Sequence, residues 1–367
     1  MRKKCRLMFF ILCMCMWMWM LQTGRVLAQN EAIGLLVQRY EDYQESFAGI
    51  ETLDDIEESG YEKIEDHCFP VLLESFGEEE VNFVPILHKE YHRLAVLITD
   101  SGGKVLYKTD QLEANYRQLD QLEQPIKGLA AVSFQDLNHD GLTDIILIAN
   151  CENDTGEYAG KNYKIGDVLF QRDGQFYRDW RISDKINRFS MNKSAEFIAA
   201  YVRDGSSTEI LYTATTLDEL LDNGFQIIKE QNYSRNFEKQ GNLQVVPGII
   251  RMAEYDVFMI YLVNEQGSIV WSFQPMEDYD NLYALKGMTC RDMDRDGMKD
   301  IVVLARYSYA GPEGELLIDT KCDIYYQRTD GFEEDKEFEK SYQCTEKDTM
   351  AGLVEIIREY WGWTKEE

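Results

Sequence analysis

Apolar and polar residues alternate along most of the chain, in short runs that Gly, Asn and Asp interrupt. Alternation of this kind is typical of β-strands that bury one face, and the interrupting residues favour turns. In the first half of the chain the pattern predicts strands over residues 81–89, 92–100, 104–109, 129–135, 144–151, 164–172 and 175–179. The chain is therefore expected to be mainly β.

Three segments instead repeat their apolar residues at helical spacing, over about 31–47, 192–203 and 350–361. The apolar face of the first segment consists of Ile33, Leu36, Val37, Tyr40 and Phe47. The apolar face of the last consists of Met350, Leu353, Val354, Ile357 and Trp361. Asp348 is the expected N-cap of that last helix. We expect these helices at the periphery of the sheets.

The second half of the chain repeats the first. Five residues of one acidic loop recur 156 residues later: Asp136, Asn138, Asp140, Gly141 and Asp144 correspond to Asp292, Asp294, Asp296, Gly297 and Asp300. The segment DVLFQR, at 167–172, matches DIYYQR, at 323–328, with the same spacing. RLAVLITDSGGKVLY, at 93–107, parallels VFMIYLVNEQGSIVW, at 257–271. Chance does not hold one spacing over such a length, so the sequence predicts an internal duplication.

The repeat divides the chain into five predicted segments. They are a signal peptide (1–28), an N-terminal helical segment (29–60), repeat unit one (61–204), a connector (205–224) and repeat unit two (225–367). Each repeat unit is expected to be an antiparallel sheet closed by a helix, which makes the fold a β-rich α+β fold. A propeller-like arrangement and two packed sheets both remain open as its form.

The first 28 residues have the layout of a secretory signal peptide. Basic residues precede an apolar run from Leu7 to Leu21, and a polar stretch ends at Val26-Leu27-Ala28. An uncleaved membrane anchor is the alternative, but the run is shorter than the ~20 residues that a spanning helix needs. We therefore expect cleavage after Ala28 and a protein that is extracellular or held at the cell surface.

The charge balance limits the partners of the protein. The whole chain has 38 basic and 66 acidic residues, a formal charge of −28, and removing residues 1–28 leaves 33 basic residues and a charge of −33. A surface of this sign repels nucleic acid and anionic lipid and attracts cations. Nucleic-acid binding is therefore not expected, and neither is a stable membrane span after cleavage.

Five cysteines remain after cleavage, namely Cys68, Cys151, Cys290, Cys322 and Cys344. None lies opposite another cysteine in the duplicate, so disulfides are not the framework that the two copies share. A Cys322–Cys344 bridge is the pairing to consider, although we favour mostly buried free thiols.

The shared feature is the pair of acidic loops. Calcium takes six to eight oxygen ligands, and oxygens at positions 1, 3, 5 and 9 of a loop, with the carbonyl at position 7, can surround one ion. The first loop offers Asp136, Asn138, Asp140, the carbonyl of Leu142 and Asp144. The second offers Asp292, Asp294, Asp296, the carbonyl of Met298 and Asp300. Two calcium sites are expected, with the side chains at position 4, His139 and Arg295, pointing away from the ion into solvent.

These loops are not EF-hands, because position 12, where an EF-hand has glutamate, is Leu147 in one and Val303 in the other. The pattern DxNxDGxxD followed directly by an apolar strand resembles the calcium loops of FG-GAP and VCBS repeats. Those repeats occur in integrin alpha-chain propellers and in many secreted bacterial proteins. The resemblance implies calcium binding by the ten residues named above and an extracellular β-rich scaffold.

Other chemistry has little support in the sequence. The four histidines, His67, His88, His92 and His139, show no paired zinc-ligand spacing. No nucleophile elbow, P-loop or dinucleotide motif occurs, and no catalytic residue can be assigned among so many carboxylates. The expected function is that of a secreted calcium-binding scaffold or binding protein without catalytic activity, whose partner is an unknown extracellular protein or glycan. An extracellular hydrolase or lyase, with glycans as one substrate class and with structural calcium loops, is the alternative.

Overall fold

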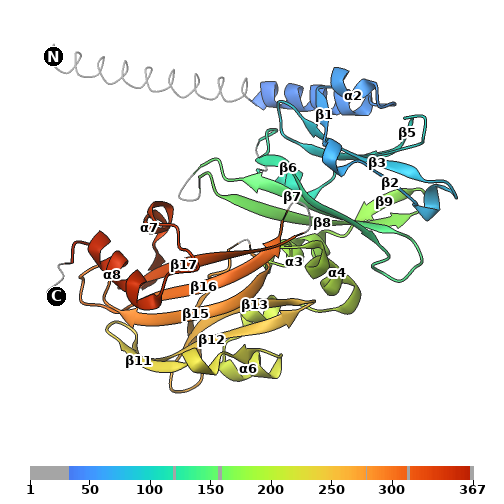
Figure 1. The fold of residues 1–367 in the computed structure, drawn as a ribbon. Helices are drawn as coiled ribbons and strands as arrows, with labels where there is room; N and C mark the ends of the chain where they lie inside the picture. Colours follow the sequence, from blue (N-terminus) through green and yellow to red (C-terminus); the bar gives the residue numbers. More distant parts are fainter. Residues whose placement is uncertain (1–32, 119–120, 156–158, 278, 312–314, 364–367) are drawn as a thin grey trace, which may run out of the picture. The chain divides into compact units, whose positions relative to one another are not determined.

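The fold is shown in Figure 1 as a computed structural model, which describes residues 33–118, 121–155, 159–277, 279–311 and 315–363. It is mainly β, with four antiparallel sheets and peripheral helices, which confirms the predicted fold class. The predicted signal peptide, residues 1–28, lies outside the described residues. Within the described ranges, no helix is both long and apolar enough to cross a membrane.

Each sheet is built from strands that follow one another in the chain. The first sheet contains β1 (Tyr61–Lys63), β2 (Phe69–Val71), β3 (Val81–His88), β4 (Leu94–Thr99) and β5 (Val105–Thr109). The second contains β6 (Ile126–Gln135), β7 (Asp144–Glu152), β8 (Asn162–Arg172) and β9 (Gln175–Arg178). The third contains β10 (Gln226–Ile227), β11 (Tyr233–Phe237), β12 (Gly241–Met252), β13 (Tyr255–Val263) and β14 (Ile269–Phe273). The fourth contains β15 (Asn281–Arg291), β16 (Asp300–Ala310), β17 (Leu316–Arg328) and β18 (Gly331–Glu334).

The helices are shorter than the sheets are wide. Residues 33–48 form the first helix. The others are α2 (Asp55–Glu58), α3 (Trp180–Arg188), α4 (Ala195–Asp204), α5 (Glu209–Thr213), α6 (Leu217–Asp222), α7 (Lys336–Ser341) and α8 (Met350–Tyr360). Single 3₁₀ turns are η1 (Glu65–His67), η2 (Glu74–Phe76), η3 (Glu113–Tyr116) and η4 (Lys229–Gln231).

The duplication is visible in the strand pairing. The first and third sheets have the same strand order, and so do the second and fourth. An isolated bridge joins Thr52 to Lys104, and another joins Thr216 to Ser268, so both partners lie 164 residues apart in the two copies. The register shift between β4 and β5 also recurs between β13 and β14 with the same spacing. The correspondence therefore begins before residues 61 and 225, where the sequence predicted the repeat units to start.

The spacing between the copies changes once. It is 164 residues in the first and third sheets and 156 in the acidic loops of the second and fourth, so copy two is shorter by 164 − 156 = 8 residues. The loss falls between the sheets of a copy, because residues 110–125 join β5 to β6 whereas only 274–280 join β14 to β15. Copy one therefore has the longer connector.

By its internal contacts the chain forms two compact units, which do not coincide with the two copies. The first unit comprises residues 1–128, 152–160 and 173–175, and its described part contains the first sheet. The helix at 33–48 packs Tyr43 and Phe47 on one face of that sheet, against Tyr61 and Ile86 (Figure 1). The second unit comprises the rest of the chain and contains the third and fourth sheets and most of the second.

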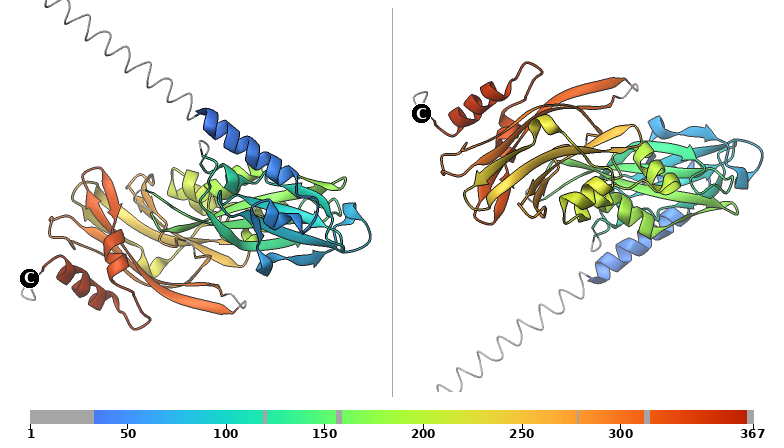
Figure 2. Two further views of the ribbon diagram at one scale, coloured as in Figure 1. Left: turned by 90° about the horizontal axis from the view of Figure 1, so that it is seen from above. Right: turned by 90° about the horizontal axis from the view of Figure 1, so that it is seen from below.

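Within the second unit, helices cover the second and fourth sheets as predicted. Helices α7 and α8 lie on one face of the fourth sheet (Figure 2), where Leu353 and Ile357 join a core with Val302 and Ile324. The opposite face of that sheet and the apolar sides of α3 and α4 belong to a second, larger core. The prediction that Asp348 caps α8 was wrong: the hydroxyl of Thr349 accepts the hydrogen bond from Gly352, and the carboxylate of Asp348 accepts from the N–H of Thr345 instead.

The cysteines do not build this framework. Cys344 carries a free thiol, so the Cys322–Cys344 bridge is not formed, and Cys68 and Cys290 are also free thiols. Cys151 and Cys322 are buried in strands β7 and β17.

Candidate metal centre

The two acidic loops occupy equivalent places. Loop one, residues 136–144, joins β6 to β7, and loop two, residues 292–300, joins β15 to β16. In both sheets these are neighbouring antiparallel strands, as the sequence predicted. Both loops lie in the second compact unit.

The aspartate at position 1 organises each loop by accepting backbone hydrogen bonds. The two oxygens of Asp136 accept from the N–H groups of Asp140 (3.2 Å) and Gly141 (3.0 Å). Those of Asp292 accept from Arg295 (2.8 Å) and Gly297 (3.0 Å). The turn needs a positive φ at position 6, where Gly141 has +83° and Gly297 has +81°, values that glycine adopts without strain.

The aspartate at position 9 fixes the loop to the sheet. Asp144 and Asp300 are completely buried. The oxygens of Asp144 accept from the N–H groups of Leu137 (3.0 Å) and Gln171 (2.9 Å). Those of Asp300 accept from Met293 (2.7 Å) and Gln327 (2.9 Å). One carboxylate therefore joins the start of the loop to the third strand of the sheet in both copies.

Burial of these carboxylates is costly for a negative charge. Burial raises the pKa of Asp300 to about 7, and the charges of Asp294 and Asp296 raise it further against the two backbone hydrogen bonds. Burial likewise raises the pKa of Asp144, with smaller contributions from Asp140 and Asp136. A cation bound here would reverse this effect, because an opposite charge nearby favours the ionised carboxylate.

Positions 3 and 5 complete the acidic side of each loop. Asn138 accepts from the N–H of Asp140 (3.0 Å) and donates from its amide to the Asp140 carboxylate (3.0 Å). At position 7, the N–H groups of Leu142 and Met298 donate to the position 5 carboxylates, Asp140 (2.9 Å) and Asp296 (2.8 Å). The carbonyls at position 7 remain predicted ligands.

Three predicted ligands of loop two converge. One oxygen each of Asp292, Asp294 and Asp300 lies within 4.8 Å of the other two. The donors are all carboxylate oxygens, with no sulfur or imidazole among the predicted ligands, so they suit a hard cation such as calcium better than zinc or copper. Loop one has the same framework, but Asn138 replaces the carboxylate at position 3.

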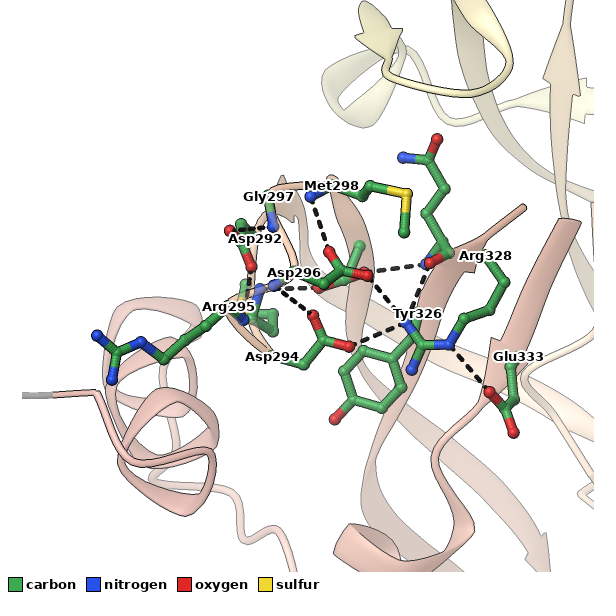
Figure 3. A network of polar contacts seen from close by, with 12 residues as sticks. Asp292, Asp294, Arg295, Asp296, Gly297, Met298, Tyr326, Arg328 and Glu333 are labelled. Carbon is green, nitrogen blue, oxygen red and sulfur yellow. Dashed lines mark hydrogen bonds and ion pairs between the residues drawn. The ribbon is translucent and has the colours of Figure 1, made fainter.

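Sequence reasoning missed the arginine that closes loop two. The guanidinium of Arg328 lies 2.9 Å from Asp294 and 3.3 Å from Asp296, and its Nε lies 3.0 Å from Glu333 (Figure 3). It also lies 5.0 Å from the centre of the Tyr326 ring. The signal was present in the sequence, because the dipeptide Gln-Arg ends both repeated strand segments and no strand requires it.

A second missed group connects loop two to the third sheet. Glu238, in the turn between β11 and β12, pairs with the ammonium of Lys299 and accepts from its N–H (2.9 Å). Gln327 donates to Glu238 (3.2 Å) and to the carbonyl of Lys299 (3.1 Å). Burial acts to raise the pKa of Glu238, but these donors outweigh it and hold the pKa at about 2. The carboxylate is therefore ionised at neutral pH.

The position 4 side chains are exposed, as predicted, and Arg295 points away from the acidic cluster in Figure 3. Arg295 is not simply solvated, because it donates to the carbonyl of Gly362 (3.0 Å). The indole of Trp363 donates to the carbonyl of Met293 (2.7 Å), and Arg358 donates to that of Asp292 (2.9 Å). The C-terminal segment thus braces loop two from outside.

Comparison with known proteins adds one structural neighbour. No family model matches the chain, and no curated protein matches it. Among solved structures, the chain is similar to the exo-inulinase from Aspergillus awamori, with a TM-score of 0.21 and 11% sequence identity over 72% of this chain and 48% of that one. The match thus spans about half the length of the inulinase. The resemblance of the loops to FG-GAP and VCBS repeats stays a prediction.

Proposed function

We propose that the protein is a secreted calcium-binding scaffold or binding protein without catalytic activity, in which each acidic loop holds one calcium ion. The observation that carries the proposal is the repeated framework. In both loops the position 1 aspartate accepts backbone hydrogen bonds from inside the loop, and a fully buried position 9 aspartate joins the loop to the third strand.

Calcium would act by removing an electrostatic cost. Four carboxylates of loop two, and three of loop one, are concentrated within nine residues, and each loop buries one of them. Like charges at such short range repel, whereas a divalent cation among them is attracted to all. Bound calcium would therefore stabilise the first two strands of the second and fourth sheets relative to the unfolded chain.

Secretion and the class of partner belong to the same proposal. The predicted signal peptide would deliver the protein to a compartment where calcium is abundant. Extracellular loops of this kind typically bind calcium with dissociation constants of about 10⁻⁴–10⁻³ M. The scaffold would present its surface to an extracellular protein or glycan.

The test is a thermal melt with chelator and then with millimolar calcium, combined with calorimetric titration. At a calcium concentration about 100 times the dissociation constant, each site should add about 2.7 kcal/mol of stability. We expect two equivalents of calcium to bind and the melting temperature to rise.

Matched variants identify the sites. Asp136→Asn and Asp292→Asn should each remove one equivalent of bound calcium, while Glu265→Gln, an exposed acid outside the loops, should leave both. An unchanged wild-type melt together with no heat of binding would show that the loops are acidic turns that bind nothing.

A further inference from the structure

A cavity of about 450 Å³ lies within the first compact unit, between the helix at 33–48 and the connector from β5 to β6. Its size falls in the range of small-molecule sites, which is roughly 300–1,000 Å³. The residues that matter to the argument are Leu36, Val37, Tyr40, Arg93, Asn115 and Leu122. It lies outside the unit that carries the acidic loops.

The cavity contains a buried positive charge. Arg93 is only 3% exposed, its Nη1 donates to the carbonyl of Asn115 (3.2 Å), and its guanidinium lies 5.1 Å from the centre of the Tyr43 ring. Among the described residues, no carboxylate oxygen lies within 4.0 Å of it, and its buried Nε has no acceptor. A buried charge without a counter-charge is costly, so this arginine lacks a partner that its position calls for.

The fold itself does not require an arginine there. The equivalent position in copy two, 164 residues later, is Val257, which is buried in β13 as an apolar residue. Asn115 and Leu122 lie in the connector that is eight residues longer in copy one. The polar floor of the cavity therefore belongs to copy one alone, which sets it apart from the duplicated scaffold.

The walls are apolar and open to solvent. Leu36, Val37 and Tyr40 line the cavity from one face of the helix and are 42%, 50% and 37% exposed. On an amphipathic helix this face normally packs against the protein. Here it borders a cavity whose floor carries a guanidinium.

We propose that this cavity binds a small amphipathic anion, with its apolar body against Leu36, Val37 and Leu122 and a single carboxylate paired with the guanidinium of Arg93. Arginine suits this role because its planar fork matches a carboxylate. Glu41 also lines the cavity and would repel a second negative charge, so the ligand carries one.

The test uses octanoate and octan-1-ol as probes, titrated calorimetrically into the protein as its host produces it, with chelator present throughout. A chelator keeps the result independent of the calcium loops. A hydrogen bond to a charged group is worth about 1.5–3 kcal/mol, so octanoate should bind with one-to-one stoichiometry and at least about tenfold more tightly than the alcohol.

Two aspartate substitutions on the same helix give a matched pair. Val37→Asp places a negative charge in the cavity wall and should weaken octanoate binding at least about tenfold. Leu35→Asp, 67% exposed and outside the lining, should leave it unchanged. Arg93→Met should abolish the preference for octanoate over octanol, and the helix variants decide the question if that protein does not fold. The proposal is overturned by the absence of saturable octanoate binding, by equal binding of acid and alcohol, or by equal binding to the two helix variants.

Discussion

Arg328 holds a charge balance in loop two that bears on metal binding. Its guanidinium lies within 3.3 Å of two predicted calcium ligands, Asp294 and Asp296, and so does part of the neutralising work of a cation. Loop two has one more carboxylate than loop one, and charge count alone predicts that it fills first. The arginine offsets that difference.

Replacing Arg328 should therefore have effects of opposite sign with and without calcium. In chelator, Arg328→Met loses partly exposed ion pairs and should lower stability by about 1 kcal/mol or less. In calcium titrations the same variant should bind more tightly at loop two, because a competing positive charge is gone. Calorimetry and urea denaturation measure the two effects.

Arg291→Met is the matched control. It removes the same charge from an exposed position next to loop two, without a contact to Asp294 or Asp296. If both variants changed calcium affinity equally, only the overall charge, and not the contact of Arg328, would matter.

His88 makes the first compact unit sensitive to acid. Its Nδ1 accepts hydrogen bonds from the N–H groups of Glu90 (3.2 Å) and Tyr91 (3.0 Å), which requires an unprotonated nitrogen. Burial lowers the pKa of His88 from its usual 6.5, outweighing the nearby Glu90 charge, and Arg93 and His92 lower it further. The unfolded chain therefore takes up more protons below pH 6.5 than the folded chain, so this contribution to stability is present above that pH and is lost as the pH falls.

His88→Ile should reduce this loss of stability between pH 7 and pH 5, measured by urea denaturation. Ile250 occupies the equivalent register position in copy two, so an isoleucine suits the strand. His139→Asn, a change at an exposed histidine, should lose as much stability in acid as the wild type does. A variant at His88 that is as acid-sensitive as the wild type would assign the effect to other groups.

At the scale of residues, the sequence supplied the acidic loops but not the groups around them. Spacing alone identified positions 1, 3, 5 and 9, because calcium geometry is local in the chain. Arg328 and Glu238 contact loop two from positions 28 and 62 residues away from Asp300 in sequence. Only the strand pairing brings them together, and no local pattern encodes it.

Among the elements, the closing helices pack on their sheets differently in the two copies. A Cβ added at Gly166 in β8 would lie 2.8 Å from Ile186 and 2.9 Å from Ile198, which belong to α3 and α4. The equivalent position in copy two is Cys322, whose side chain fits beneath α7 and α8. The helices of copy one therefore lie closer to their strand than those of copy two.

Gly166→Ala should consequently destabilise the protein by about 1–3 kcal/mol through overpacking, measured as a shift of the urea midpoint. Gly352→Ala is the opposite case. Its Cβ would lie 3.4 Å from the Thr349 hydroxyl inside α8, so the alanine should stabilise by about 0.5–1 kcal/mol. Destabilisation by both changes would contradict the close packing inferred for copy one.

Periodicity predicted the longer elements well. The strands from 81 to 179 lie within three residues of their predicted ends. β1 and β2 were missed because three residues are too short to display alternation, and the start of β6 was missed because Lys127 and Gly128 interrupt its apolar pattern. The position of the α8 cap was wrong because Asp348 and Thr349 are both good caps and only the geometry distinguishes them.

For the whole molecule, both acidic loops lie in one of the two compact units. Calcium should therefore increase amide hydrogen-exchange protection in β6, β7, β15 and β16, where the loops are fixed to the sheets. Protection in β3, β4 and β5 of the first unit should stay unchanged. Octanoate should produce the reverse distribution.

Hydrogen-exchange mass spectrometry with and without calcium, in wild type and in Asp292→Asn, measures this. The variant should lose the calcium effect in β15 and β16 and keep it in β6 and β7. Equal protection of both units by calcium would contradict the assignment of the sites.

The duplication itself was predictable because identical spacing over many residues has no other explanation. The division into compact units was not, because it depends on which sheets share a core and not on which segments share an ancestor. The predicted repeat units describe the history of the chain better than its packing.

That history has one practical consequence. The connector of residues 110–125 exceeds its counterpart, 274–280, and the cavity with Arg93 lies against the longer one. Copy two shows that a sheet pair of this design closes with the short connector. Copy one was thus free to diverge after the gene duplicated, and a specialised role arising in one paralogous half while the other keeps the ancestral architecture is the division of labour that such events allow.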